Sequence, residues 1–303
     1  MIPALWSHAL AAYLWQVFLH SAVAAVVVLL WSRAVPIPSG RTRRRLLVGV
    51  LVIPMLTAAI PGRAALPWRA EWAWLDGARL LALPIVGGVR VHHLVLISAI
   101  LTVGATLWQE VVPVLHKPRR SEQAAPAALV DAARAQPGWS RCDVTLLDDP
   151  HLVLASAGWP WHPRLLISTS FLTQLTSEQR AVALRHESAH WIDGRWAGAH
   201  LLFLLRLAQL HNPVALWCFR EYLLEVEVDC DRRAVQERDV RPLVSTLLLL
   251  YEQTSPRDAA SRSALRWRVA VLLGDRPHDD AALPLLSQAV AAALLLMVLP
   301  WLV

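Results

Sequence analysis

The stretch Thr176-Ser-Glu-Gln-Arg-Ala-Val-Ala-Leu-Arg-His-Glu-Ser-Ala-His190 decides how the rest of the chain is interpreted. Thr176 and Gln179 have the spacing of a capping box, in which the threonine oxygen accepts from the backbone N–H three residues on and the glutamine reaches back. This spacing predicts that a helix begins here and runs through His190.

The end of this helix has the spacing HExxH, formed by His186, Glu187 and His190. Positions i and i+4 share a helix face, so both imidazoles can reach one metal ion while Glu187 flanks a water on that metal. Zinc lowers the pKa of such a water to about 7, and a carboxylate then takes the proton. The alternative is a pair of polar helix positions. We expect one catalytic Zn²⁺, bound by His186 and His190, with Glu187 as the catalytic base.

A third zinc ligand is expected from a separate helix in the acid-rich stretch 221–231. Two ExxxD pairs fit, Glu225 with Asp229 and Glu227 with Asp231. At about 100° per residue the two pairs project roughly 200° apart, so only one can face the zinc. The aspartate of that pair can accept a hydrogen bond from the N–H of a zinc-bound histidine, on the ring nitrogen that does not bind the metal. The remaining acids then form a solvated face.

The residues before the zinc helix predict a small sheet. Residues 144–147, 152–155 and 165–168 are short apolar runs separated by turn signals. Residues 121–136 are rich in alanine and predict a helix. The apolar run 201–210 is too short to cross a bilayer, and a core helix is favoured over a membrane-dipping one.

The composition points to a membrane protein, because 56% of the 303 residues are hydrophobic and only 17% are charged. A soluble domain has about 45–50% apolar and about 25% charged residues. Disordered, collagen-like and small disulfide-rich classes are excluded. Four apolar runs predict transmembrane helices, with buried core helices as the alternative: 10–31, 46–60, 94–115 and 281–303.

Basic residues predict the orientation of these helices, since cytoplasmic connections are enriched in lysine and arginine. The connection after the first run and the segment after the third are both basic, with Arg33, Arg41, Arg43, Arg44, Arg45, Lys117, Arg119 and Arg120. The loop 61–91 is expected outside, where Trp68, Trp72 and Trp74 suit the interface. Both termini then lie outside, and residues 117–280 face the cytoplasm.

The net charge of +6 does not indicate direct nucleic-acid binding. Residues 117–280 contain as many acids as bases, so the excess charge belongs to the apolar part of the chain. Cys142, Cys218 and Cys230 lack a CxxC pair, which argues against a disulfide framework or a cysteine zinc cluster. Three small buried side chains are the favoured interpretation.

The predicted fold class is α+β, mainly α. We expect a membrane domain at 1–116, a zinc peptidase domain with a small sheet at 117–280, and a last transmembrane helix at 281–303. The expected location is the cell membrane, crossed several times, with the peptidase domain in the cytoplasm.

Three ordered motifs resemble those of one family. HESAH, then His211-Asn-Pro-Val-Ala-Leu-Trp217, then Glu227-Val-Asp-Cys-Asp-Arg-Arg-Ala-Val235 resemble the HExxH, NPxxW and ExxCDxxV series of the BlaR/MecR-type membrane metallopeptidases. The HtpX and CAAX-prenyl-protease gluzincins are more distantly similar. The resemblance covers about residues 141–235 and implies a gluzincin-like fold. It also implies Glu227 as third ligand and Asp231 as the partner behind the metal site, with Glu225 as the alternative ligand.

The resemblance implies an integral membrane zinc endopeptidase that cleaves a cytoplasmic repressor of the BlaI type, or its own chain. Since the sequence ends within the last apolar run, we expect a minimal form without a penicillin-binding sensor. An extended substrate can add to the expected edge strand 152–157. Tyr222, His211 and His200 are candidates for oxyanion stabilisation, each also explicable as structural.

Two other functions stay open, an HtpX-like quality-control peptidase and a membrane signalling protein whose zinc is not catalytic. The expected partners are the lipid bilayer and a protein substrate. A homo-oligomer also stays open.

Overall fold

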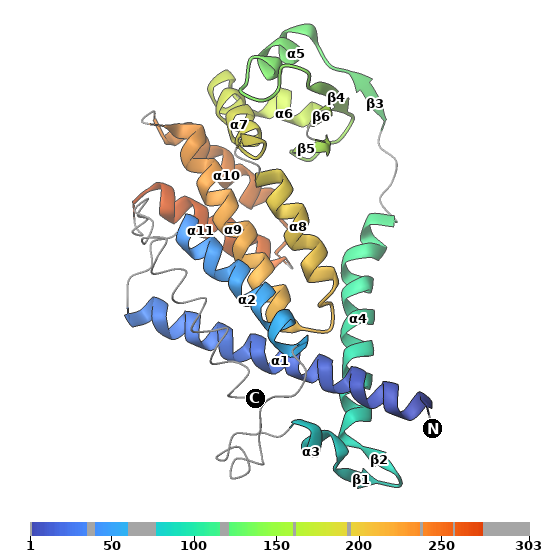
Figure 1. Ribbon diagram of the computed structural model, residues 1–303. Coiled ribbons are helices and arrows are strands. Elements are labelled where there is room, and N and C mark those ends of the chain that lie inside the picture. The colour runs from blue at the N-terminus through green and yellow to red at the C-terminus, as the bar shows by residue number, and fades with distance from the viewer. Residues whose placement is uncertain are drawn as a thin grey trace. The chain divides into compact units, whose positions relative to one another are not determined.

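The computed structural model describes residues 2–34, 40–59, 77–115, 121–159, 162–192, 195–236, 239–256 and 258–274 (Figure 1). These residues are mainly helical with two small sheets, as the sequence predicts. They divide into two compact units. The first contains the residues up to 117 and 201–222, and the second contains 118–200 and 223–279.

The first unit is built from long apolar helices. Its elements are α1 (Ile2–Ala34), α2 (Arg41–Ala59), α3 (Gly77–Ala82), the hairpin β1 (Pro84–Val86) and β2 (Val89–Arg90), and α4 (Val91–Leu115). It also includes the later part of α8 (Arg195–Leu207) and the first part of α9 (Pro213–Val235).

Two helices of the described residues are long and apolar enough to cross a membrane, with candidate spans Ala9–Leu30 and Val91–Trp108. The second span is almost entirely unburied, and Ile100, Leu101 and Trp108 are 67–71% exposed. An exposed apolar surface of this kind is unusual in a soluble monomer and marks a lipid or protein contact.

These two helices correspond to the first and third of the four expected spans. The second expected span, 46–60, lies in α2, which does not qualify as a span by itself. Four of its first five residues are Arg41, Arg43, Arg44 and Arg45, so its apolar part is short. The fourth expected span, 281–303, and the tryptophans Trp68, Trp72 and Trp74 lie outside the described residues.

Buried neutral polar groups join α1 and α2 to residues 209–212 within the first unit. His20 Nδ1 lies 2.7 Å from Thr57 Oγ1, and the Asn212 side-chain N–H donates to Ser21 Oγ at 2.9 Å. Gln209 donates to the Leu51 carbonyl at 2.9 Å. We call His20, Ser21, Thr57, Gln209 and Asn212 the neutral cluster; each is at most 3% exposed.

The His211-Asn-Pro motif begins α9. Asn212 Oδ1 accepts from the Val214 N–H at 3.1 Å, and Pro213 is the first residue of the helix. An N-cap asparagine followed by proline at the first helical position is a favoured helix start, since proline has no N–H to satisfy there.

The second unit contains a four-stranded sheet in the order β3-β4-β6-β5. The strands are β3 (Glu122–Ala124), β4 (Asp143–Leu147), β5 (Leu154–Trp159) and β6 (His162–Ser168). β4 and β6 are parallel, and the other pairs are antiparallel. The predicted small sheet is therefore present, and β5 is an edge strand as expected.

The prediction of a single helix over 121–136 is wrong. Residues 122–124 form β3, and α5 (Ala127–Arg134) begins only after Pro126. Proline disfavours helical geometry in the residue before it, here Ala125. Residues 122–124, which precede this position, pair with β4 instead.

The sheet and the helices of the second unit pack around a central helix, α7 (Ser177–Ala189), on two sides. Around it lie α6 (Thr169–Gln174), α10 (Arg241–Gln253), α11 (Ala259–Leu272) and the later part of α9. Ala183 and Leu184 of α7 belong to a core with Trp139, Leu165, Ile167 and Phe171. Val182 belongs to a second core with Ala234, Leu243 and Leu247. Packing on both sides gives the end of α7 a defined position.

Candidate metal centre

The capping box predicted for α7 is present. Thr176 Oγ1 accepts from the Gln179 N–H at 3.3 Å, and Gln179 Oε1 accepts from the Thr176 N–H at 2.8 Å. The Gln179 amide also donates to Ser245 of α10, and Arg185 Nε donates to the Ala234 carbonyl of α9 at 2.8 Å. These contacts fix both ends of α7 against its neighbours.

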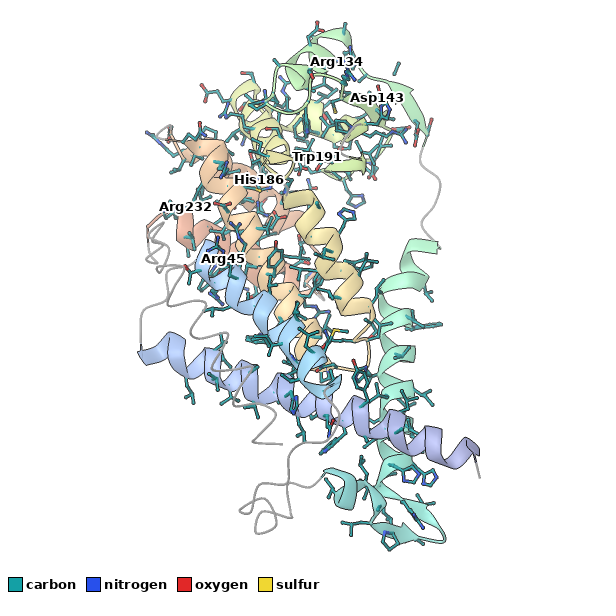
Figure 2. The ribbon with its side chains drawn as sticks, in the orientation of Figure 1. Arg45, Arg134, Asp143, His186, Trp191 and Arg232 are labelled. Atoms are coloured by element: carbon teal, nitrogen blue, oxygen red, sulfur yellow. The ribbon has the colours of Figure 1, made fainter. Side chains whose placement is uncertain are left out.

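His186, Glu187 and His190 lie together at the end of α7, with His190 as its C-cap. Figure 2 marks the place of His186. One ligand atom from each of the three lies within 4.8 Å of the others. The two imidazole rings are 5.1 Å apart in an edge-to-face arrangement. The two histidines and the glutamate can therefore surround one metal ion.

Glu227 of α9 faces both histidines. Its Oε2 lies 3.3 Å from His186 Nε2, and its Oε1 lies 3.6 Å from His190 Nε2. Asp229 is directed instead to Arg233, at 3.9 Å. Of the two ExxxD pairs, the structure brings the Glu227 pair to the histidines, and Glu225 is buried elsewhere on the same helix.

Residues 230 and 231 of α9 lie behind the two imidazoles. His186 Nδ1 is 2.8 Å from Asp231 Oδ1, although the ring N–H is not well aligned with that oxygen. His190 Nδ1 is 3.5 Å from Cys230 Sγ. Because positions i, i+3 and i+4 share a helix face, Glu227, Cys230 and Asp231 address the two histidines together. Sequence reasoning missed Cys230, and its spacing from Glu227 is the signal that could have found it.

Arg268 of α11 is a further site residue that sequence reasoning missed. Its Nε and Nη2 donate to the two oxygens of Asp231, both at 2.7 Å, and its Nη1 lies 3.0 Å from Glu227 Oε2. The signal was an arginine inside an apolar stripe, since Leu265, Val269 and Leu272 pack into the core at the neighbouring helix positions.

The carboxylates shift the ionisation of the groups around them. Burial lowers the pKa of His186, but Asp231 and Glu227 outweigh it and raise this pKa to about 10. Burial raises the pKa of Glu227 and of Asp231, yet Arg268 and His186 hold both pKa values below the ordinary range, and His190 adds to the effect on Glu227. The surroundings thus favour positive charge at His186, whereas burial lowers the pKa of His190 and favours its neutral form.

The donor set fits zinc. Two imidazole nitrogens and one carboxylate form a ligand set of catalytic zinc sites, which keep a further position for water or substrate. When both imidazoles are neutral, as metal-bound histidines are, the carboxylates of Glu187, Glu227 and Asp231 exceed Arg268 by two negative formal charges, which a divalent cation balances. Glu227 is 34% exposed, so the site is reachable from solvent.

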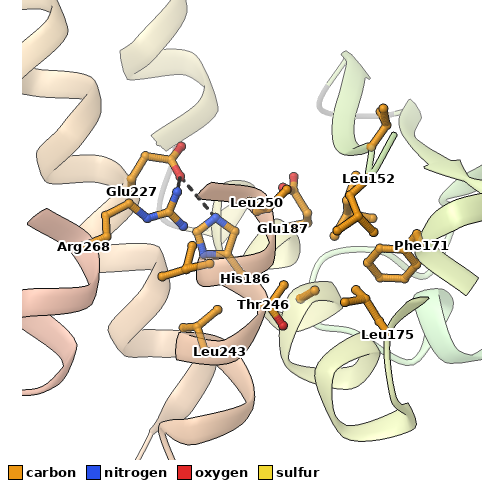
Figure 3. A pocket seen from close by; sticks show the side chains of 14 residues that line it. Leu152, Phe171, Leu175, His186, Glu187, Glu227, Leu243, Thr246, Leu250 and Arg268 are labelled. Carbon is orange, nitrogen blue, oxygen red and sulfur yellow. Dashed lines mark ion pairs between the residues drawn. The ribbon is translucent and has the colours of Figure 1, made fainter. Parts of the chain in front are cut away.

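A cavity of about 390 Å³ adjoins the site within the second unit. Figure 3 shows His186 and Arg268 directed toward Glu227, while Leu152, Phe171 and Leu175 form an apolar wall beyond Glu187. The Ser156 N–H of β5 donates to Glu187 Oε2 at 3.1 Å. The edge strand, the glutamate and an apolar cavity therefore adjoin one another.

The three candidates for oxyanion stabilisation are not among the described residues that line this cavity. Tyr222 and His211 belong to the first unit, and His200 lies on α8.

No protein-family model matches the chain, and no curated protein matches it either.

Proposed function

We propose that this protein is an integral membrane zinc endopeptidase. The observation that carries the proposal is the approach of the Glu227 carboxylate to both His186 and His190, with Glu187 beside the two histidines and hydrogen-bonded to an edge strand. The order of the three motifs, which resembles the BlaR/MecR-type series, supports the same activity.

In this proposal His186, His190 and Glu227 hold the zinc. When bound, zinc supplies a Lewis acid that acidifies a water and polarises a peptide carbonyl. Glu187 takes the proton from the water and returns it to the leaving amine, as a positioned carboxylate can. The Ser156 N–H keeps the Glu187 carboxylate turned toward β5.

The substrate is an extended peptide segment that adds to β5, the edge strand of the described sheet. Strand addition supplies main-chain hydrogen bonds, and pockets for alternate side chains supply selectivity. The cavity beside Glu187 is lined by leucine, valine and phenylalanine side chains, so it accepts an apolar substrate side chain. By the family resemblance, the substrate is a BlaI-type repressor or the chain itself.

The membrane part of the proposal extends the two observed candidate helices to four spans, adding 46–60 and 281–303. The arginines of residues 41–45 then lie in the cytoplasm, where the positive-inside rule expects them. The peptidase domain is cytoplasmic and both termini are outside.

The decisive experiment measures zinc content and proteolysis of the full chain in detergent. The variants are Glu187→Gln, Glu227→Gln and, as a matched control on the same helix, Glu225→Gln. We expect about one zinc per wild-type chain, retained metal without cleavage in Glu187→Gln, loss of metal in Glu227→Gln, and both properties retained in Glu225→Gln.

Two substrates distinguish the alternatives. Cleavage of a BlaI-type repressor at few sites supports the repressor-directed function, whereas broad cleavage of casein supports membrane-protein quality control. If Glu187→Gln leaves every activity unchanged, the zinc is structural and the peptidase proposal is wrong.

A further inference from the structure

Arg268 is a buried cation in contact with two of the carboxylates that serve the metal centre. Its side chain is 12% exposed, and all three of its nitrogens lie within 3.0 Å of a carboxylate oxygen. Two of these contacts form a fork on Asp231, and the third reaches Glu227. A planar guanidinium makes this two-oxygen contact, which an ammonium group cannot reproduce.

The contact with Glu227 distinguishes its two oxygens. Oε2 is held by Arg268 at 3.0 Å and also lies 3.3 Å from His186 Nε2, whereas Oε1 lies 3.6 Å from His190 Nε2. Arg268 therefore tethers the carboxylate through one oxygen, and the other oxygen remains directed to His190. A ligand anchored in this way needs no reorientation to meet a metal ion.

The contact with Asp231 affects the metal site indirectly, because Asp231 is the partner of a histidine and not an expected metal ligand. Both Asp231 oxygens accept from Arg268, and Oδ1 also lies 2.8 Å from His186 Nδ1. Partners behind metal-bound histidines set the ring orientation and raise ligand basicity. Arg268 on α11 thus holds the Asp231 carboxylate, and this carboxylate in turn orients the ring of His186 on α7.

We propose that Arg268 is a positioning residue of the metal centre, which fixes the orientation of Glu227 and Asp231 and so raises the affinity for zinc. This inference rests on the proposed zinc site and does not require peptidase activity. It differs from two simpler roles. A purely structural link between α11 and α9 would affect stability alone, and a purely electrostatic cation would repel zinc.

The test measures zinc affinity by competition with a chelator, on the full chain in detergent and below the thermal unfolding temperature. Arg268→Lys keeps the charge but loses the fork, and Arg268→Gln loses both. Arg266→Lys is the control, since Arg266 is exposed on the same helix and lies over the Tyr251 ring. We expect both Arg268 variants to bind zinc about 10–100-fold more weakly, and the control to bind as wild type.

Each simpler role predicts a different result that would overturn the inference. A structural link predicts lower unfolding temperatures with unchanged affinity in both Arg268 variants. An electrostatic role predicts unchanged affinity in Arg268→Lys and tighter binding in Arg268→Gln. If Arg268→Gln does not fold, the lysine variant carries the test alone. A wild type that binds zinc but cleaves nothing would contradict the proposed peptidase function and leave this measurement valid.

Discussion

Each unit of the molecule buries a polar cluster, and the two clusters differ in charge. The neutral cluster of the first unit contains no acid, lysine or arginine, and its side chains are joined by hydrogen bonds such as the one from Asn212 to Ser21. The second unit has what we call the charged cluster, formed by His186, Glu187, His190, Glu227, Asp231 and Arg268.

The difference separates a packing role from a chemical one. Buried neutral groups are tolerated when hydrogen-bonded, and such bonds hold apolar helices together. Burying ionised groups is far more costly, and a cluster whose formal charges do not cancel calls for a cation. The neutral cluster is therefore expected to support stability alone, and the charged cluster to bind metal.

Replacing one histidine in each cluster gives the largest contrast. We expect His186→Leu to abolish zinc binding and cleavage. We expect His20→Leu to retain both and to lower the free energy of unfolding by about 1 kcal/mol, since Thr57 keeps its hydrogen bond to the Ile53 carbonyl. Zinc content and thermal unfolding in detergent measure the two effects. Loss of zinc in His20→Leu would remove the distinction between the clusters.

Removing one charge from the charged cluster has the next largest effect. Asp231→Asn takes the fork partner from the buried Arg268, and breaking a buried ion pair in this way costs about 3–5 kcal/mol. Chemical unfolding of the chelator-treated protein measures this cost. The control is Asp229→Asn on the same helix, whose partner Arg233 is 3.9 Å away, and we expect a change of at most about 1 kcal/mol. Equal losses in both variants would show that the charged cluster has no special stability.

The thiol behind His190 should have a smaller effect. A thiol is a weak hydrogen-bonding group, so we expect Cys230→Ala to weaken zinc binding by less than about tenfold, below the range for carboxylate partners. Cys142→Ala is the control, because Cys142 lies in the core beside the sheet. A loss in Cys230→Ala as large as that in Arg268→Lys would rank the thiol with the charged groups.

The sequence predicted the parts of the site that depend on local contacts. The capping box and the HExxH spacing lie within one helix, so their geometry follows from α-helical periodicity alone. The choice of Glu227 over Glu225 needed the family resemblance, because periodicity separates the two faces of α9 without saying which one packs against α7.

Arg268 could not be predicted in the same way, because its partner Asp231 is 37 residues away. The contact between α11 and α9 depends on tertiary packing. Its only trace in the local sequence is one charged residue within an apolar helix stripe. The expected helix over 121–136 failed for a related reason. Its first residues pair with β4, and that pairing prevails over the helix propensity of the alanines.

The smallest expected effect is the pH dependence of folding stability, measured on protein from which a chelator has removed metal. Since the folded pKa of His186 is raised from 6.5 to about 10, its contribution to stability is complete below pH 6.5 and is lost as the pH rises to about 10. The folded pKa of Glu227 is lowered from 4.5, so its contribution is complete above pH 4.5 and is lost at lower pH. His186 and Glu227 together should therefore stabilise the chelated protein most between about pH 4.5 and 6.5, while the lowered pKa of His190 acts in the opposite direction below pH 6.5.

Thermal unfolding at pH 6 and pH 9 measures the alkaline part of this prediction. The wild type should lose more stability between these pH values than His186→Gln, which lacks the titrating ring. His151→Gln is the control, since His151 is largely exposed beside Asp149 and should behave as wild type. Added zinc should stabilise the wild type more at pH 9 than at pH 6, because metal and proton compete for the same imidazole. An equal pH response in wild type and His186→Gln would mean that Asp231 and Glu227 do not control the proton on His186.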